Sequence, residues 1–281
     1  MKKVGVVGAG TMGAGIAQHM AGAGCDVVLH DVKTQYLEKG VDRIEGSLEK
    51  AVEKDIISTE EKKETLDSII TSTDLKKMKD RDLIVEAVTE DMEIKKKVFQ
   101  DIDTICPSDT VLATNTSALS ITELATSVSR PEKVLGLHFF NPVPLMDLVE
   151  CVYGLTTDDE IFRECCDFIA ETGKEVVEVE ESPGFIVNRI LIPMINDAAF
   201  LLQQDVAEAA DIDKAMEKGA NHPIGPLALG DMIGLDVVLS IMETLHEELG
   251  EDKYRPSLLI RKKVRAGELG RKTGRGFYSY D

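Results

Sequence analysis

One short stretch near the start of the chain constrains its fold more than any other. Lys2 to Val7 is an apolar run typical of a buried strand, and it leads directly into Gly8-Ala9-Gly10-Thr11-Met12-Gly13. Apolar residues then recur at helical spacing, from Ile16 to Ala21. This is the G-x-G-x-x-G pattern in the setting it requires, between a strand and a helix. The sequence therefore predicts a strand, a tight glycine turn and a helix that begins at the turn.

The glycine turn predicts a dinucleotide-binding site. The first glycine would permit the tight turn, the second a close approach of the backbone to a pyrophosphate, and the third close packing of helix on strand. The free N–H groups at a helix N-terminus and the helix dipole favour an anionic group there. We therefore expect cofactor contacts from Gly8, Gly10, Thr11, Met12 and Gly13.

A carboxylate at the end of the next predicted strand supports this interpretation. Asp31 follows the apolar run Val27 to Leu29 and would accept hydrogen bonds from ribose hydroxyls. Its charge would repel a 2′-phosphate, so NAD is expected over NADP. Lys33 lies close enough to weaken that preference, which leaves NADP as a possible cofactor. The alternative role for Asp31 is that of an ordinary turn or helix-capping residue.

Strand-like and helix-like segments alternate up to about residue 180, and this favours a mostly parallel sheet with helices on both faces. From Ser182-Pro183 onward only helices are predicted, because Ser followed by Pro is typical of a helix start. These helices are expected at about 183–204, 206–219, 225–249 and 256–266. The expected fold is α/β, a Rossmann-type doubly wound, mostly parallel sheet followed by an all-α C-terminal domain, with domains at 1–183 and 184–281.

Composition excludes several classes of function. A formal net charge of −19 argues against binding to nucleic acid or to an anionic membrane. The longest apolar run, 185–202, contains charged and polar residues and predicts a buried or interfacial helix rather than a membrane span. Five cysteines form no disulfide framework and no zinc-binding spacing, and no signal peptide is expected because the first predicted strand begins at residue 2. We therefore expect a cytoplasmic protein without a metal site.

A histidine and a glutamate twelve residues apart form a candidate catalytic pair. The segment HFFNPVPLMDLVE runs from His138 to Glu150 and predicts a strand, a proline-containing turn and a second strand. Alternate side chains of a strand share a face, so Glu150 falls on the apolar face of Leu148 and Val152. A carboxylate there needs a partner, which a histidine on the neighbouring strand would supply. Such a histidine is suited to act as a general base, the alternative being a purely structural contact.

Several motifs together resemble one known family. GAGTMGAGIAQ, DLIVEAV, ATNTSALSI, HFFNPVPLMDLVE and SPGFIVNRIL are similar to segments of the L-3-hydroxyacyl-CoA dehydrogenases, and the resemblance continues to the closing GRKTGRGFYSY. The compact length resembles that of the bacterial 3-hydroxybutyryl-CoA dehydrogenases. The resemblance implies interconversion of (S)-3-hydroxybutyryl-CoA and acetoacetyl-CoA with NAD(H). It also implies a homodimer or higher homo-oligomer formed through the helical domain.

The resemblance implies roles for four catalytic residues. His138 would be the general base toward the 3-hydroxyl group, and Glu150 would orient it and stabilise its imidazolium form. Ser117 would donate a hydrogen bond to the substrate oxygen. Asn188, from the second domain, would reach the same oxygen or the thioester end. Neutral donors of this kind suit an oxygen that gains charge in the transition state.

Further residues are implied only as contacts with the cofactor or the substrate. Glu90 and Lys95 would lie near the nicotinamide ribose, and Asn115 would contact the cofactor. Ser47 and Lys54, on the charged helix after the second strand, would contact the CoA nucleotide.

Each of these residues also has a structural interpretation. Ser117 could cap the short helix that follows it, and Asn188 could make a buried structural hydrogen bond. Glu90 and Lys95 could form an ordinary ion pair at a helix start. Ser47 and Lys54 could belong to a solvated helix face.

Two rival functions stay open at this point. One is a β-hydroxyacid dehydrogenase that acts on free acids. Enzymes of that group are similar to one another in having a catalytic lysine on the long helix. The corresponding stretch PGFIVNRIL has Asn188 and no lysine, which disfavours it. The other is a non-catalytic dinucleotide-binding structural protein, which would not require the pair of His138 and Glu150.

Overall fold

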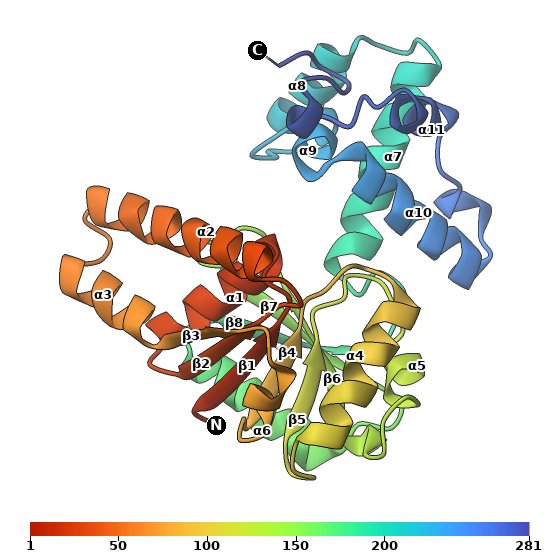
Figure 1. The fold of residues 1–281 in the computed structure, drawn as a ribbon. Coiled ribbons are helices and arrows are strands. Elements are labelled where there is room, and N and C mark those ends of the chain that lie inside the picture. The colour runs from red at the N-terminus through yellow and green to blue at the C-terminus, as the bar shows by residue number, and fades with distance from the viewer. Residues whose placement is uncertain (281) are drawn as a thin grey trace. The chain divides into compact units, whose positions relative to one another are not determined.

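The computed structural model describes residues 1–280, and it divides the chain into two compact units, Met1–Glu181 and Ser182–Asp281 (Figure 1). The division falls at 181/182, against the 183/184 expected from the sequence.

The first unit is built on one eight-stranded sheet with the strand order β3-β2-β1-β4-β5-β6-β7-β8. Neighbouring strands are parallel throughout, except that β6 and β7 pair antiparallel. This confirms the predicted Rossmann-type, mostly parallel sheet. The strands are β1 (Lys3–Val7), β2 (Asp26–His30), β3 (Ile69–Ser72), β4 (Leu83–Glu86), β5 (Val111–Thr114), β6 (Val134–Phe139), β7 (Leu148–Tyr153) and β8 (Glu175–Glu180).

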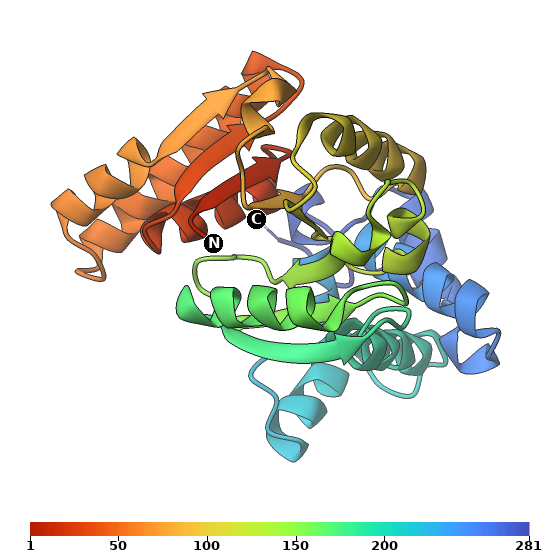
Figure 2. The ribbon, with the colours of Figure 1, turned by 90° about the horizontal axis from the view of Figure 1, so that it is seen from below.

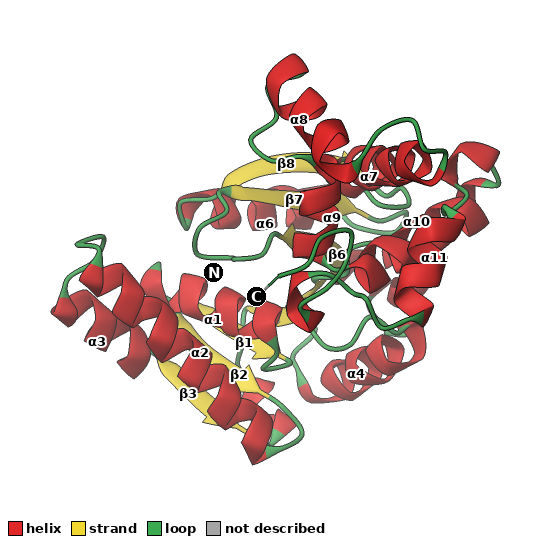
Figure 3. Cartoon of the chain, turned by 90° about the horizontal axis from the view of Figure 1, so that it is seen from above, coloured by secondary structure: helices red, strands yellow, loops and turns green. Residues whose placement is uncertain are grey.

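Helices cover both faces of this sheet. On one face, α1, α2 and α3 pack together over the β1–β3 part of the sheet (Figure 3), and α6 packs on β7 and β8 (Figure 2). Helices α4 and α5 cover the other face. The helices of this unit are α1 (Thr11–Gly22), α2 (Thr34–Glu53), α3 (Thr59–Asp67), α4 (Met92–Ile105), α5 (Ile121–Ala125) and α6 (Asp159–Glu171), with 3-10 turns η1 (Leu75–Met78) and η2 (Pro131–Lys133).

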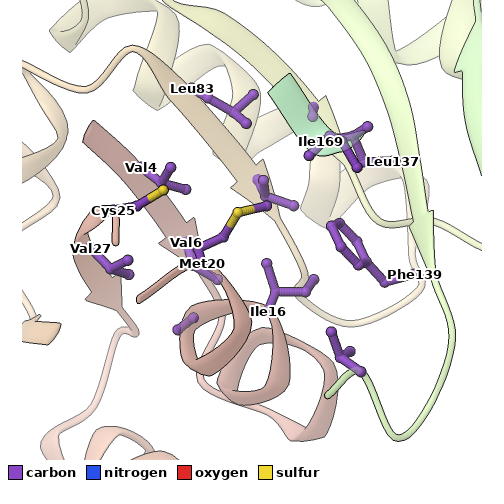
Figure 4. Packing of buried hydrophobic residues seen from close by; sticks show 14 of the residues in the cluster. Val4, Val6, Ile16, Met20, Cys25, Val27, Leu83, Leu137, Phe139 and Ile169 are labelled. Carbon is purple, nitrogen blue, oxygen red and sulfur yellow. The ribbon is translucent and has the colours of Figure 1, made fainter. Parts of the chain in front are cut away.

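Alternation along the strands assigns side chains to the two faces. Val4, Val6 and Leu83 belong to one buried cluster, together with residues of α1, α2 and α6 (Figure 4). The intervening residues therefore face the other way, toward α4 and α5. Glu86 is one of these, and it pairs with Lys95 of α4. The central strands are apolar on both faces because helices bury both sides of a parallel sheet.

The second unit is entirely helical apart from isolated β-bridges near its C-terminus. Its core lies between α7, α9, α10 and α11, with Ile195, Val238 and Met242 fully buried. The helices are α7 (Val187–Gln203), α8 (Ala209–Gly219), α9 (Pro226–Ile233), α10 (Leu235–Leu249) and α11 (Leu258–Arg265), with 3-10 turns η3 (Asp252–Tyr254) and η4 (Arg271–Thr273).

Two helix predictions for this unit were wrong in detail. The first helix begins at Val187 rather than near 183, because Gly184 and Phe185 have φ angles of 72° and 52°. The segment 225–249 forms two helices instead of one. Gly234, with φ of 106°, separates them, and this is a conformation that glycine adopts readily and an α-helix excludes.

Candidate active site

The hairpin of β6 and β7 brings the predicted histidine and glutamate together. The antiparallel register sets His138 opposite Glu150, and the Nδ1 atom of His138 lies 2.7 Å from Oε2 of Glu150. The two residues are 5% and 1% exposed. With its Nδ1–H donated to the carboxylate, the imidazole presents Nε2 as its proton acceptor. The predicted pairing is thus confirmed, and its geometry is that of a histidine oriented by a buried carboxylate.

The glycine turn has the close backbone approaches that its sequence predicted. A Cβ atom on Gly8, whose φ is 106°, would lie 2.5 Å from the carbonyl oxygen of Ala87. A Cβ atom on Gly13 would lie 1.7 Å from the carbonyl oxygen of Gly8. At Gly10, by contrast, a Cβ atom would meet nothing within 4 Å. The turn is therefore packed tightly against the sheet and open at its middle glycine, as a dinucleotide pyrophosphate requires.

Asp31 is fixed at the carboxyl end of β2 by this same turn. Its Oδ2 atom accepts a hydrogen bond of 2.8 Å from the backbone N–H of Ala9. The neighbouring Lys33 ammonium lies 5.4 Å from the centre of the Tyr36 ring. These positions fit a dinucleotide whose phosphates would lie at the turn.

Glu90 and Lys95 are joined to Ser117 through a network of hydrogen bonds and an ion pair. Lys95 is 1% exposed, and its ammonium lies 3.2 Å from Oε2 of Glu90. Oε1 of Glu90 accepts hydrogen bonds from the Thr116 hydroxyl at 2.6 Å and from the backbone N–H of Ser117 at 2.8 Å. The Ser117 hydroxyl lies 3.2 Å from the same oxygen. Burial favours the neutral form of Glu90, but Lys95 and these donors hold the pKa of its carboxyl below the ordinary value.

The sequence interpretation missed the centre of this network, which is Glu86. This residue is fully buried at the end of β4, and its two carboxylate oxygens lie 2.9 and 3.0 Å from the Lys95 ammonium. It also accepts hydrogen bonds from the backbone N–H of Val88 at 2.7 Å and from the Thr114 hydroxyl at 2.6 Å. The only signal in the sequence was an acid that ends the strongly apolar strand LIVE.

A buried lysine holds the turn between β6 and β7. The Lys174 ammonium donates to the carbonyl oxygens of Val143 and Met146, both at 2.7 Å. Burial and then the Lys174 charge lower the pKa of His19 to about 4, so this histidine is neutral near pH 7. Its Nε2 atom lies 2.9 Å from the Thr172 hydroxyl. Lys174 therefore fixes the turn that follows β6, and nothing in the sequence pattern indicated this lysine.

The remaining predicted residues are placed as follows. Asn115 follows β5, and its Oδ1 atom accepts a hydrogen bond of 3.0 Å from the backbone N–H of Phe139. Ser47 is half-buried on α2 and lines a cavity, whereas Lys54 is the exposed residue at the C-terminal end of that helix. Thr11 and Met12 are the first two residues of α1, and Asn188 is in the first turn of α7 in the second unit.

Two kinds of site are absent from the described part of the chain. Over residues 1–280 no group of three or more His, Cys, Asp or Glu side chains could hold a metal ion. No helix in that range is both long enough and apolar enough to cross a membrane.

Comparison with known proteins places both units in one family. Residues 3–182 match the family model described as 3-hydroxyacyl-CoA dehydrogenase, NAD binding domain, and residues 184–280 match its C-terminal domain. The chain is 50% identical over 279 residues to a 3-hydroxybutyryl-CoA dehydrogenase of Clostridioides difficile, and the aligned region covers 99% of each chain.

Solved structures agree with this comparison. The (S)-3-hydroxybutyryl-CoA dehydrogenase PaaH1 of Ralstonia eutropha is 46% identical, with a TM-score of 0.96 over 100% of this chain and 99% of that one. FadB2 of Mycobacterium tuberculosis is 41% identical, with a TM-score of 0.98 over 100% and 99% of the two chains. The chain therefore belongs to the 3-hydroxyacyl-CoA dehydrogenase family and is an NAD-dependent oxidoreductase.

Proposed function

We propose that this enzyme interconverts (S)-3-hydroxybutyryl-CoA and acetoacetyl-CoA, with His138 as the general base and acid. The observation that carries the proposal is the 2.7 Å contact between His138 Nδ1 and Glu150 Oε2, both residues being buried. The short-chain substrate is supported by the similarity over nearly full length to proteins named 3-hydroxybutyryl-CoA dehydrogenase.

The protein's own groups handle the proton in this reaction. When bound, the nicotinamide accepts or supplies the hydride. His138 takes the proton of the 3-hydroxyl group at Nε2 in the oxidation and returns it in the reduction. Glu150 stabilises the imidazolium that His138 forms in the oxidation and that donates the proton in the reduction. In the neutral ring, Glu150 favours the tautomer that leaves Nε2 as the proton acceptor.

Hydrogen-bond donors complete the proposed site. Ser117 and Asn188 donate to the substrate oxygen, which gains negative charge as the hydroxyl proton leaves. Glu90 accepts a hydrogen bond from the backbone N–H of Ser117, and this supports an ordered position for the serine. The Ser117 hydroxyl would exchange its contact with the same carboxylate oxygen for the substrate oxygen. Neutral donors leave the histidine as the proton acceptor.

NADH is the proposed cofactor in preference to NADPH, and Gly8, Gly10, Thr11, Met12 and Gly13 are its proposed phosphate contacts. The carboxylate of Asp31, oriented by the Ala9 N–H, would face a 2′-phosphate with like charge. The Lys33 ammonium lies over the Tyr36 ring, 5.4 Å from its centre, a contact that favours its position there. Glu90, Lys95 and Asn115 are proposed contacts near the nicotinamide end, and Ser47 and Lys54 contacts with the CoA nucleotide.

The test is a spectrophotometric assay with acetoacetyl-CoA, in which NADH and NADPH are compared in parallel. Rapid oxidation of NADH, with a much lower kcat/KM for NADPH, is expected. Oxidation that persists unchanged in His138→Gln would contradict the proposed base. Activity on free 3-hydroxy acids with none on CoA thioesters would favour the β-hydroxyacid dehydrogenase alternative.

We also propose a cytoplasmic homodimer or larger homo-oligomer formed through the second unit. Ile190, Val206 and Leu258 of this unit are each more than 60% exposed, and a subunit interface would bury such side chains. The five cysteines are all unpaired and buried, which suits a reducing compartment. Analytical ultracentrifugation tests the assembly, and a monomer at micromolar concentration would contradict it.

A further inference from the structure

A carboxylate at the end of β8 holds the start of the short helix α5. Glu181 directly follows β8, and it accepts hydrogen bonds from the Ser120 hydroxyl at 2.5 Å and from the backbone N–H of Thr122 at 3.0 Å. The Thr122 hydroxyl is a third donor to the same carboxylate. The first N–H groups of a helix have no partner within the helix, so α5 gains here an acceptor from a segment about sixty residues away in the chain.

This carboxylate is presented from the sheet itself. The backbone N–H of Glu181 donates to the carbonyl oxygen of Tyr153 at 3.0 Å, which extends the pairing of β8 with β7 by one residue. The Thr122 hydroxyl oxygen also accepts a hydrogen bond of 2.9 Å from the backbone N–H of Leu155, just after β7. The first turn of α5 is therefore tied to two backbone segments beside the end of the sheet.

Helix α5 lies on the face of β6 that carries the proposed base (Figure 1). Ile121 is fully buried, and a Cβ atom on Gly136 of β6 would lie 3.0 Å from its Cδ1 atom. Gly136 and His138 are two residues apart on the strand, so they share a face. The position of the first turn of α5 is thus set on the same surface of β6 as His138.

Ser117 lies on a segment that two carboxylates hold from its two sides. Residues 115–120 connect β5 to α5 and carry this serine. On one side Glu90 accepts from the Thr116 hydroxyl and from the Ser117 N–H. On the other side Glu181 accepts from the start of α5. Removal of the second carboxylate would leave the segment held by Glu90 alone.

We infer that Glu181 is a positioning residue of the enzyme, which sets the place of the Ser117 hydroxyl relative to His138 by fixing the start of α5. It acts through Ser117 rather than on the reacting atoms. The inference rests on the proposed function, because it needs Ser117 as a donor to the substrate oxygen. Such a donor accelerates the reaction only when it is held where the oxygen gains charge, so its displacement lowers kcat more than it raises KM.

The test is a double-mutant cycle on kcat for the reduction of acetoacetyl-CoA. Glu181→Ala is expected to lower kcat about tenfold and to leave the KM for NADH nearly unchanged. Ser117→Ala, which removes the donor itself, is expected to lower kcat by about 10²-fold. Because Glu181 acts through Ser117, kcat of the double variant should equal that of Ser117→Ala within about twofold. A role in stability alone would make the two losses multiply.

Neighbouring residues supply the controls. Glu180→Ala is the matched control, because Glu180 is an exposed residue of β8 whose carboxylate makes no hydrogen bond or ion pair within residues 1–280, and kcat should not change. Glu181→Gln keeps an oxygen acceptor and should keep kcat within about threefold of the wild-type value. If thermal unfolding shows that Glu181→Ala is not folded, Thr122→Val removes one donor to the carboxylate and should lower kcat about two- to fivefold, with no further loss beside Ser117→Ala.

An unchanged kcat in Glu181→Ala would overturn the inference, as would a tenfold loss that recurs in the Ser117→Ala background. An unchanged kcat in Ser117→Ala would remove the role of the serine and the inference with it. The proposed function fails separately, if the wild-type enzyme does not oxidise NADH with acetoacetyl-CoA.

Discussion

The buried lysine of α4 gives the sharpest prediction about stability. Lys95 is the single ammonium between two carboxylates, Glu86 and Glu90, at distances of 2.9 and 3.2 Å. Lys95 and Glu86 are 1% and 0% exposed, so little water can replace a missing partner. Substitution of Lys95 by methionine keeps the apolar stem and removes the charge. We expect Lys95→Met to leave Glu86 as a buried carboxylate without a cation.

The magnitude follows from the contacts that survive. Removal of one partner from a buried ion pair costs about 3–5 kcal/mol. Glu86 keeps two neutral donors, the Val88 N–H and the Thr114 hydroxyl, so we expect the lower end of this range. A loss of about 3 kcal/mol is a large part of the roughly 5–15 kcal/mol by which a domain is stable. At about 2–4 °C per kcal/mol for a unit of this size, Tm should fall by about 6–12 °C.

Lys97→Met, on the same helix, is the matched control. The Lys97 side chain is 72% exposed and pairs with Asp101 at (i, i+4), a contact worth at most about 0.5 kcal/mol. The chain contains no tryptophan, so unfolding is followed by circular dichroism in urea or on heating. A Lys95→Met variant as stable as Lys97→Met would refute the reasoning. It would mean that the buried pair contributes no more than an exposed one.

The same variant has a predicted pH dependence. In the wild-type protein the pKa of Glu90 lies below its ordinary value. Its ionised form therefore adds to the free energy of unfolding above about pH 4.3, and this contribution is lost as the pH falls through the lowered pKa. Lys95→Met removes part of that contribution. The difference in unfolding free energy between wild type and variant should therefore be largest near pH 7 and shrink below about pH 4. A difference that grows on acidification would contradict the assigned sign.

Four further predictions concern the base, the cofactor and two glycines. His138→Gln should lower kcat by about 10²–10⁴-fold, because it removes the proton acceptor, and it should leave the Kd for NADH unchanged. A titration of NADH binding, run beside the turnover assay, checks both expectations. Asp31→Ser should lower the ratio of kcat/KM for NADH to kcat/KM for NADPH by at least about tenfold, because the charge that repels a 2′-phosphate is gone. An unchanged ratio would mean that residues other than Asp31 discriminate between the two cofactors. Gly13→Ala should weaken NADH binding and cost about 1–3 kcal/mol or more of stability, because its Cβ would lie 1.7 Å from the Gly8 carbonyl oxygen. Gly46→Ala, within α2 and with nothing within 4 Å of its Cβ, should instead raise stability by about 0.5–1 kcal/mol, as thermal unfolding of the two variants will show.

Local patterns in the sequence were enough to predict the sheet and its hairpin. Leu83, Ile84 and Val85 are apolar at successive positions, which is typical of a strand in a sheet covered on both faces. The pairing of His138 with Glu150 followed from the alternation of side chains and the turn between them, both of which lie within thirteen residues. These features depend only on neighbours along the chain.

Contacts between distant segments could not be predicted in the same way. Glu86 is visible in the sequence as an acid at the end of a buried strand, but its partner is known only once α4 packs on that face of the sheet. Lys174 lies 28 residues from Met146, whose carbonyl oxygen it binds. Gly234 gave no clear signal, since a glycine is tolerated within a helix until its φ angle is known. In each case the missing information was the position of a second element.

The single antiparallel pair of strands explains why the candidate site is built where it is. In a parallel sheet the carboxyl ends of the strands meet at one edge, and the glycine turn and Asp31 lie there. His138 is near the end of β6 and reaches that edge in the same way. Glu150 is near the start of β7, and it reaches the same edge only because β7 runs in the opposite direction. The reversal of one strand therefore sets a buried carboxylate beside the histidine without a further crossover helix. A short turn then closes the hairpin, and Lys174 holds that turn in place.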